Sequence, residues 1–139
     1  MLYVQRMTDT SRLPTRATEG SAGLDLYADE DITIPPHHGQ AWVETGISVS
    51  IAPWQYGKVE PRSGLAGKQI TVDAGTIDND YRGPLRVLMV NRSARYYGIQ
   101  RGDKIAQLIL QPYCQEEVVE VDALAETMRG AAGFGSSGV

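Results

Sequence analysis

Short stretches in which apolar and polar residues alternate, separated by Gly, Pro, Asp and Asn, recur along most of the chain and constrain its fold most strongly. Alternation with a period of two, with a turn signal about every 8–12 residues, is typical of strands in an antiparallel sandwich or barrel. We therefore expect an all-β fold of jelly-roll type. The expected strands are residues 3–6, 24–27, 31–34, 40–45, 47–51, 56–60, 69–72, 85–90, 96–99, 104–110 and 117–121, and short helices are expected at 63–68 and 122–128.

Length and charge exclude several classes of protein. The 139 residues suffice for one domain with its own core. The net charge of -4 argues against binding to nucleic acid or to an anionic membrane surface, because such proteins usually carry a basic balance or patch. No run approaches the roughly 18 apolar residues of a membrane span. Residues 1–6 contain no long apolar core, so we expect no signal peptide.

The single cysteine, Cys114, cannot form a disulfide within the chain, which fits a reducing compartment. We therefore expect a cytoplasmic or nuclear protein. Because Cys114 follows an apolar run and free cysteines are often buried, we expect its thiol to be buried rather than catalytic.

The most polar segment of the chain, GTIDNDYRGP at residues 75–84, lies between two apolar, β-branched stretches. The flanking residues 69–72 and 85–90 predict the two strands of a hairpin. Its tip holds two carboxylates, an aromatic ring and a cation, and glycines at both ends permit close approach of a ligand. We therefore interpret it as a binding or catalytic loop; the alternative is a solvated loop that contains these residues by chance.

Three other positions interrupt the apolar pattern. Asp25 lies within a strand-like run. A carboxylate there either points outward from the pleated strand or is held in place for a functional role. Ser63 begins a short helix, where it either caps the helix or contacts an anion at the helix N-terminus. Gln107 interrupts the apolar face of residues 104–110. By contrast, the adjacent His37 and His38 would point apart on a strand and lack a third ligand nearby, so they are expected to form a turn.

The glycine-rich end, residues 129–139, contains Arg129, two adjacent serines and Phe134, which is the one phenylalanine of the chain. Alone it has few side chains to offset the entropy of ordering. One interpretation is a frayed terminus. The other is an arm that closes over a phosphorylated base, with a ring to stack and donors to bind phosphate.

Five segments in this order resemble the five motifs of the homotrimeric dUTP diphosphatases (dUTPases): AGLDLYA at 22–28, PRSGLA at 61–66, GTIDNDYRG at 75–83, RGDKIAQLIL at 101–110 and RGAAGFGSSG at 129–138. The resemblance implies a distorted jelly roll of the β-clip type, with a core at residues 1–128 and a flexible arm at 129–139. It also implies a homotrimer whose active sites are shared between subunits. The implied reaction is hydrolysis of dUTP to dUMP and pyrophosphate by attack of water on the α-phosphorus. Such a reaction keeps uracil out of DNA and supplies dUMP for thymidylate synthesis.

The resemblance also implies a role for each matched residue. Asp78 would be the catalytic base, Tyr81 would pack on the deoxyribose and Phe134 would stack on uracil. The uracil edge would be bound by Gly75, Thr76, Ile77 and Arg86, and the phosphates by Arg62, Ser63, Gly64, Gln107, Arg129, Gly135, Ser136 and Ser137. Mg²⁺ would ride on the triphosphate, and Asp25 would contact it through water.

Departures from the family pattern are few. Pro84 stands where an acidic residue is frequent, Asp73 where small residues are common, and Ser137 replaces the frequent threonine. None of these changes removes a reacting group.

Three alternative functions use the same fold or a related assembly. A dCTP deaminase, or a bifunctional deaminase-diphosphatase, would release ammonia from dCTP. A nucleotide-dependent signalling or binding protein would use the ordered arm as its readout. A catalytically inactive structural trimer is disfavoured because Asp78 and Arg129 are present.

Overall fold

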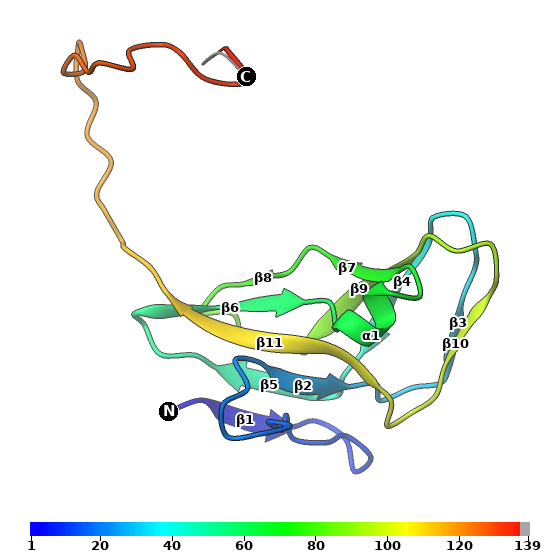
Figure 1. Ribbon diagram of the computed structural model, residues 1–139. Coiled ribbons are helices and arrows are strands. Elements are labelled where there is room, and N and C mark those ends of the chain that lie inside the picture. The colour runs from blue at the N-terminus through cyan, green and yellow to red at the C-terminus, as the bar shows by residue number, and fades with distance from the viewer. Residues whose placement is uncertain (137–139) are drawn as a thin grey trace.

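The computed structural model describes residues 1–136 and places eleven strands and one short helix within that range. They are β1 (Tyr3–Arg6), β2 (Leu24–Tyr27), β3 (Ile32–Ile34), β4 (Gly39–Glu44), β5 (Ile47–Ser50), β6 (Gln55–Glu60), α1 (Ser63–Ala66), β7 (Ile70–Asp73), β8 (Thr76–Ile77), β9 (Arg86–Asn91), β10 (Tyr97–Ile99) and β11 (Lys104–Pro112). The predicted all-β architecture is confirmed (Figure 1). No helix in residues 1–136 is long and apolar enough to cross a membrane.

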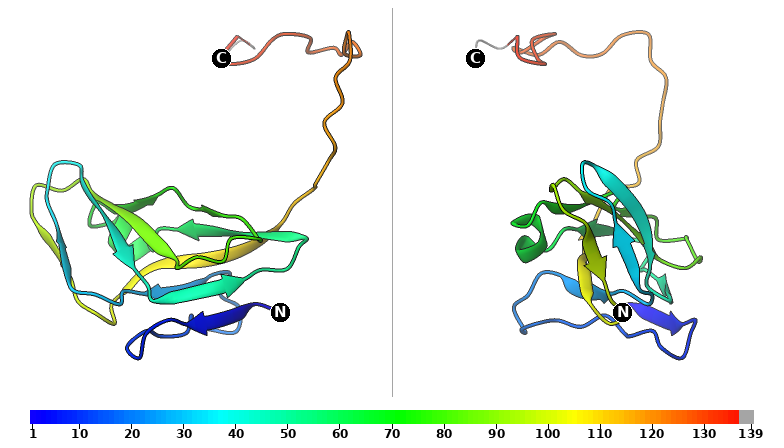
Figure 2. Two further views of the ribbon diagram at one scale, coloured as in Figure 1. Left: turned by 180° about the vertical axis from the view of Figure 1, so that it is seen from behind. Right: turned by 90° about the vertical axis from the view of Figure 1, so that its right-hand side faces the viewer.

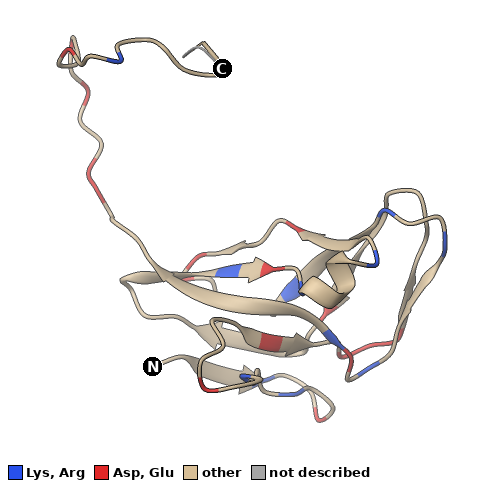
Figure 3. Cartoon of the chain, in the orientation of Figure 1, with Lys and Arg blue, Asp and Glu red and all other residues tan. Residues whose placement is uncertain are grey.

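All strand pairs are antiparallel and form two larger sheets and two ribbons. One sheet has the order β2-β11-β6-β8 and the other β4-β9-β7, while β1 pairs with β5 and β3 with β10. Figures 1 and 2 show these sheets wrapped around one interior, with the β3–β10 ribbon at one end. Basic and acidic residues are interspersed along the chain of this body, residues 1–112 (Figure 3).

Alternation along the strands sends one set of apolar side chains into the space between the sheets. Eleven of these residues are at most 1% exposed: Leu26, Ile34, Val43, Ile47, Ile70, Leu85, Val87, Met89, Ile105, Ala106 and Leu108. Full burial of one valine, leucine, isoleucine or methionine side chain contributes about 1.5–3 kcal/mol to folding. This core fixes the strands from which the polar segments project.

The predicted central hairpin is confirmed to within one residue at each strand. β7 and β9 pair from Ile70↔Asn91 to Asp73↔Leu88. Between them, β8 leaves the hairpin and pairs with β6 instead, through Gly57↔Ile77 and Lys58↔Thr76. This pairing was not predicted, because two residues are too short for a recognisable periodicity. It folds the polar tip back against the body.

The predictions for the segment after β11 are wrong. Residues 117–121 form no strand and residues 122–128 no helix. A strand needs a hydrogen-bonded neighbour, and a helix shorter than about 12 residues is marginal without packing. Val118 and Leu124 are 99% and 86% exposed, so neither element has anything to pack on within this chain. Cys114 is also exposed rather than buried, because the chain leaves the body at Pro112.

Candidate functional site

A cavity of about 230 Å³ lies where the tip of the hairpin folds back. It is lined by Trp42, Ala74, Thr76, Ile77, Asp78, Tyr81, Pro84, Leu85 and Arg86. Its volume is below the roughly 300–1,000 Å³ of sites for drug-sized ligands, so it suits a small ring and its substituent. The lining combines apolar walls with one carboxylate and one guanidinium.

The close approach of Gly75 to β6 shapes this cavity. The amide of Val59 donates to the carbonyl of Gly75 at 2.7 Å. A Cβ atom at Gly75 would lie well under 3.0 Å from the Val59 carbonyl oxygen, a separation that real Cβ atoms essentially never show. Ala74 before it has a φ of 50°, in the left-handed region that non-glycine residues rarely adopt. Only glycine at position 75 permits this path.

The tip is braced by its own hydrogen bonds. The Tyr81 amide donates to the Asp78 carbonyl at 3.1 Å, and the Tyr81 hydroxyl donates to the Pro84 carbonyl at 2.9 Å. Arg82 Nη1 donates to the Asn79 carbonyl at 2.6 Å. A side chain at Gly83 would collide with the Tyr81 ring. The Asp78 carboxylate stays exposed, and Tyr81 is 43% exposed, so both are accessible to a ligand.

Trp42 is a member of the cavity wall that the sequence did not point to. It lies on β4, and the guanidinium of Arg86 lies 4.9 Å from the centroid of its ring, a cation–π contact. Trp42 occurs in an alternating strand, where an aromatic residue indicates only packing on a sheet. The register of β4 with β9 brings it beside the hairpin.

A second cluster surrounds the carboxylate of Asp25, which is 8% exposed. Arg62 Nε and Lys104 Nζ each lie 3.4 Å from one of its oxygens. Asp25 is therefore held inward by two cations. Gln107, opposite Asp25 in the β2–β11 register, donates from Nε2 to the Pro61 carbonyl at 3.1 Å, which explains the polar residue in that strand.

At α1, Arg62 is the N-cap residue and makes no side-chain capping bond. Of the two roles considered for Ser63, that of the helix cap is therefore not the one it has here. Ser63 and Gly64 are both exposed at the start of this helix. A side chain at Gly64 would meet nothing within 4 Å. Both residues are thus accessible to a ligand from solvent.

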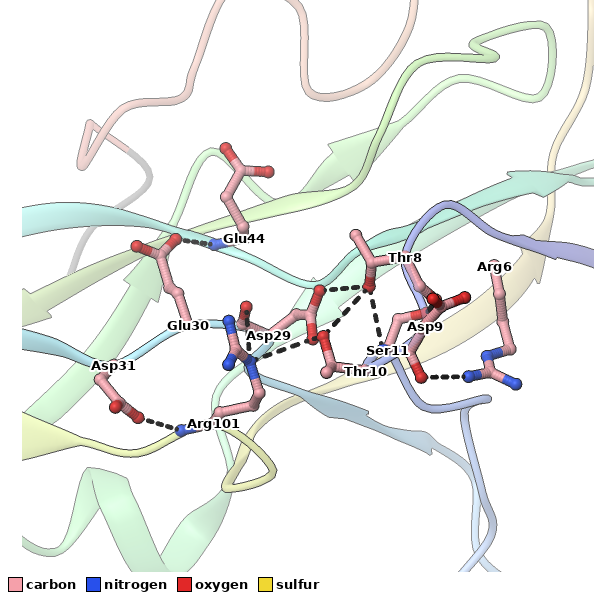
Figure 4. A network of polar contacts seen from close by, with 10 residues as sticks. All are labelled: Arg6, Thr8, Asp9, Thr10, Ser11, Asp29, Glu30, Asp31, Glu44 and Arg101. Atoms are coloured by element: carbon pink, nitrogen blue, oxygen red, sulfur yellow. Dashed lines mark hydrogen bonds and ion pairs between the residues drawn. The ribbon is translucent and has the colours of Figure 1, made fainter.

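A third polar group, shown in Figure 4, is centred on Asp29, whose side chain is 4% exposed. Burial opposes its ionisation, but hydrogen bonds from the hydroxyls of Thr8 at 2.6 Å and Thr10 at 2.7 Å, with the charges of Arg101 and Arg6, lower the pKa of Asp29 below its ordinary value. This carboxylate holds the N-terminal segment against the turn before β11. Arg101 belongs to the segment RGDKIAQLIL, but in this structure its side chain stabilises the fold through its contacts with Asp29.

Comparison with known proteins now decides the family. The dUTPase family model matches residues 9–138. The chain belongs to the dUTPase family. It is 44% identical, over 99% of its length and 95% of the relative, to the deoxyuridine 5'-triphosphate nucleotidohydrolase of Saccharomyces cerevisiae. It is also 44% identical, over 99% of its length and 98% of the relative, to that of Paramecium bursaria Chlorella virus 1.

The fold is likewise that of a dUTPase. A dUTPase variant of Staphylococcus bacteriophage 80alpha with dUpNHpp superposes with a TM-score of 0.91 at 27% identity, covering 100% of this chain and 99% of the other. The predicted family and fold are thereby confirmed. The deaminase alternative finds no support in these comparisons.

Within this dUTPase chain, the predicted site residues fall into three groups. Thr76, Ile77, Asp78, Tyr81 and Arg86 line the hairpin cavity; Gly75 does not, although both its neighbours in the chain do. Asp25, Arg62, Ser63, Gly64 and Gln107 form or adjoin the second cluster and do not line that cavity in the described chain. Arg129, Phe134, Gly135 and Ser136 lie on the C-terminal segment, which extends away from the body (Figures 1 and 2). Ser137 is outside the described residues.

Proposed function

We infer that this dUTPase hydrolyses dUTP to dUMP and pyrophosphate by in-line attack of water on the α-phosphorus. The observation that carries this inference is the hairpin cavity, whose lining brings together both residues of β8, Asp78 and Tyr81. A small cavity with few polar groups suits one pyrimidine nucleoside. The carboxylate at its mouth suits activation of water beside it.

The cavity supplies specificity through fit and hydrogen bonding. We propose that the backbone from Gly75 to Ile77 binds the edge of uracil, with Arg86 on the facing strand. Cytosine presents the opposite donor and acceptor pattern at position 4, and buried groups left unpaired in this way support discrimination on the order of 10⁴. The ring of Tyr81, fixed through its hydroxyl to Pro84, would close the space that a ribose 2′-hydroxyl needs.

Asp78 would orient the attacking water and accept its proton. It is exposed at the end of β8, and the turn that follows is fixed by the bond between the Tyr81 amide and its carbonyl. Carboxylates are weak bases. Placement of the water and stabilisation of charge must therefore provide much of the acceleration.

The phosphates would meet the cationic cluster around Asp25 and α1. Arg62 and Lys104 already lie together at Asp25, and Gln107 is adjacent to them in the sheet. In this scheme Arg62, Ser63, Gly64 and Gln107 contact phosphate oxygens, and Arg129, Gly135, Ser136 and Ser137 of the arm cover them. Phe134 would stack on the base, a contribution of about 1–3 kcal/mol.

We propose that Mg²⁺ accompanies the triphosphate. A solved dUTPase from phage phi11 of S. aureus, 25% identical, is described with a structural Mg(II) ion. Across residues 1–136, no three His, Cys, Asp or Glu side chains gather at one point. Mg²⁺ usually binds nucleotides through phosphate oxygens and keeps several waters, and in this scheme Asp25 would contact those waters. When bound, the ion would neutralise charge that develops on the phosphates.

We further propose a homotrimer with shared sites. The hairpin cavity and the Asp25 cluster share no residue in one chain. The C-terminal segment leaves the body after β11 and extends away from it (Figure 1). The segment carries exposed Val118, Val119 and Leu124 among acidic residues (Figure 3). β1 pairs only with β5 and is bordered by a cavity of about 440 Å³ that includes exposed Tyr3 and Trp54. A neighbouring subunit would cover these surfaces and complete the site.

An intracellular location, cytoplasmic or nuclear, stays a prediction.

Pyrophosphate release from dUTP, dCTP, dTTP and UTP tests the activity, with ammonia release from dCTP measured in parallel. We expect turnover of dUTP alone, and loss of that turnover when Mg²⁺ is chelated. Comparable turnover of UTP would contradict the role of Tyr81. Sedimentation of the same sample tests the trimer: a fully active monomer would overturn the shared site.

A further inference from the structure

Asn79 is the residue of the hairpin tip whose side chain turns back toward the body. Its neighbours Asp78 and Asp80 are exposed, whereas Asn79 is half-buried. Its Nδ2 atom lies 3.1 Å from the Pro53 carbonyl oxygen, 3.0 Å from that of Gln55 and 2.8 Å from the Tyr113 hydroxyl. A carboxamide has two N–H donors, so three acceptors occupy it fully. The residue next to the proposed base is therefore anchored to two other segments.

Tyr113 is the first residue after β11 and so stands at the root of the C-terminal segment. Its ring packs edge-on against Tyr56, with centroids 5.8 Å apart and an interplanar angle of 85°. Its amide donates to the Trp54 carbonyl at 3.3 Å. Its hydroxyl also accepts a hydrogen bond from Gln115 Nε2. The position of this tyrosine is thus coupled to the direction in which the segment departs.

This contact lies behind the catalytic loop. A second cavity, of about 550 Å³, is lined by Tyr56, Thr76, Asp78, Asn79, Asp80, Tyr113 and Gln115. Thr76 and Asp78 line both this cavity and the hairpin cavity. The loop that carries Asp78 therefore lies between the two cavities. The hydrogen bond between Asn79 and Tyr113 supports it on the side of the second cavity.

We propose that Asn79 and Tyr113 are positioning residues for hydrolysis: their hydrogen bond couples the root of the C-terminal segment to the loop that carries Asp78. The proposal rests on the proposed function, in which Asp78 places the attacking water. An arm that docks on nucleotide changes the direction of the chain at Tyr113, and the Asn79 amide transmits that change to the residue before it. A shift of about 1 Å at a reacting group can cost about 100-fold in rate.

The test is a double-mutant cycle on dUTP hydrolysis by the full chain. Tyr113→Phe removes the hydroxyl and retains the ring against Tyr56; Asn79→Ala removes the amide. We expect kcat to fall about tenfold for Tyr113→Phe, corresponding to one lost hydrogen bond, and about 100-fold for Asn79→Ala, with KM changed less than about twofold. The double variant should be no slower than Asn79→Ala, because both changes break one contact. Additive losses, or a change in KM alone, would overturn the proposal.

Tyr56→Phe is the matched control. It removes a hydroxyl from the same aromatic pair, but this hydroxyl donates to Gln111 at 2.6 Å and not to Asn79. We expect kcat close to that of the wild type. An equal loss in this variant would show a general effect of the aromatic pair and would refute the specific coupling. Asn79→Asp retains the shape without the donors, and recovery of wild-type kcat in it would also refute the proposal.

Hydrogen exchange without nucleotide separates this proposal from the proposed function. In Tyr113→Phe, the peptide spanning residues 78–82 should exchange faster, because the Tyr81 amide bonded to Asp78 loses its support, whereas β9 should be unchanged. If the wild type fails to hydrolyse dUTP, the proposed function fails and exchange still decides the coupling. If the wild type is active but exchange of 78–82 is unaltered, only the positioning proposal fails. Should Asn79→Ala not fold, Tyr113→Phe carries the test alone.

Discussion

Replacing Gly75 by alanine tests the geometry of the hairpin site most directly. Gly75 has no left-handed φ, so alanine is not excluded by its backbone angles. The obstacle is the Val59 carbonyl oxygen, which the new Cβ would approach to well under 3.0 Å, whereas ordinary contact begins at 3.4 Å. Because that oxygen belongs to the backbone of β6, the hairpin and β6 must separate by roughly 1 Å. Such a movement would also lengthen the 2.7 Å bond from the Val59 amide to Gly75.

The magnitude follows from two opposing effects. Forcing one extra carbon into a closely packed site costs about 1–3 kcal/mol. Replacing glycine also restricts the unfolded chain, which returns about 0.4–1 kcal/mol. The net expected loss is about 1–2 kcal/mol, or roughly 4–8 °C in the unfolding midpoint for a chain of this size. The shift of about 1 Å beside Asp78 should lower kcat/KM about 100-fold.

The assay combines thermal unfolding with pyrophosphate release from dUTP, and Gly98→Ala is the control. Gly98 also lies in a strand, but a Cβ there would meet nothing within 4 Å. That variant should equal or slightly exceed the wild type in stability and match it in kcat/KM. If Gly75→Ala behaved in the same way as Gly98→Ala, the close approach of the hairpin to β6 would not exist in solution and the site geometry would have to be abandoned.

Three further predictions concern the base, the arm and the buried carboxylate. Asp78→Asn should bind a non-hydrolysable dUTP analogue about as well as the wild type while kcat falls by a factor on the order of 10³, as measured by calorimetry and pyrophosphate release; near-normal turnover would refute its role as base. Deletion from Arg129 onward should abolish dUTP hydrolysis and leave the sedimentation coefficient of a trimer, and an active truncated protein would contradict arm closure. Asp29→Asn should lose about 1–2 kcal/mol in urea unfolding at neutral pH, because Thr8 and Thr10 then donate to a neutral group. Since folding lowers the pKa of Asp29, its stabilisation is present above the ordinary value of 3.8 and disappears as the pH falls through the lower folded pKa. The two proteins should therefore converge in acid, and a difference that grows there would show the opposite shift.

Much of the fold could be predicted because alternation is a local property. The strands around Leu26, Val43 and Leu108 each have small or apolar residues at every second position, and these positions are buried or half-buried in the structure. The hairpin was predictable for the same reason, since two apolar runs flank one polar tip. The family was predictable because five segments occur in order along the chain.

Several features of the candidate site could not be predicted, since they depend on contacts between segments distant in sequence. Trp42 joins the cavity through the register of β4 with β9, and Asn79 is anchored by residues 24 and 34 positions away. The Asp25 carboxylate is held inward by ion pairs with Arg62 and Lys104, which lie far from it in sequence. Periodicity contains no information on which element will lie beside which.

The amino-acid sequence by itself determined that this protein is built from strands, that residues 75–84 form a polar hairpin tip and that the chain has the motifs of a dUTPase. The tertiary structure alone decided that β8 pairs with β6, that Gly75 sits against Val59 and that residues 117–128 remain without regular structure in this chain. The reason is physical: a side-chain pattern selects the local conformation, whereas a backbone hydrogen bond forms only where folding supplies a partner for it.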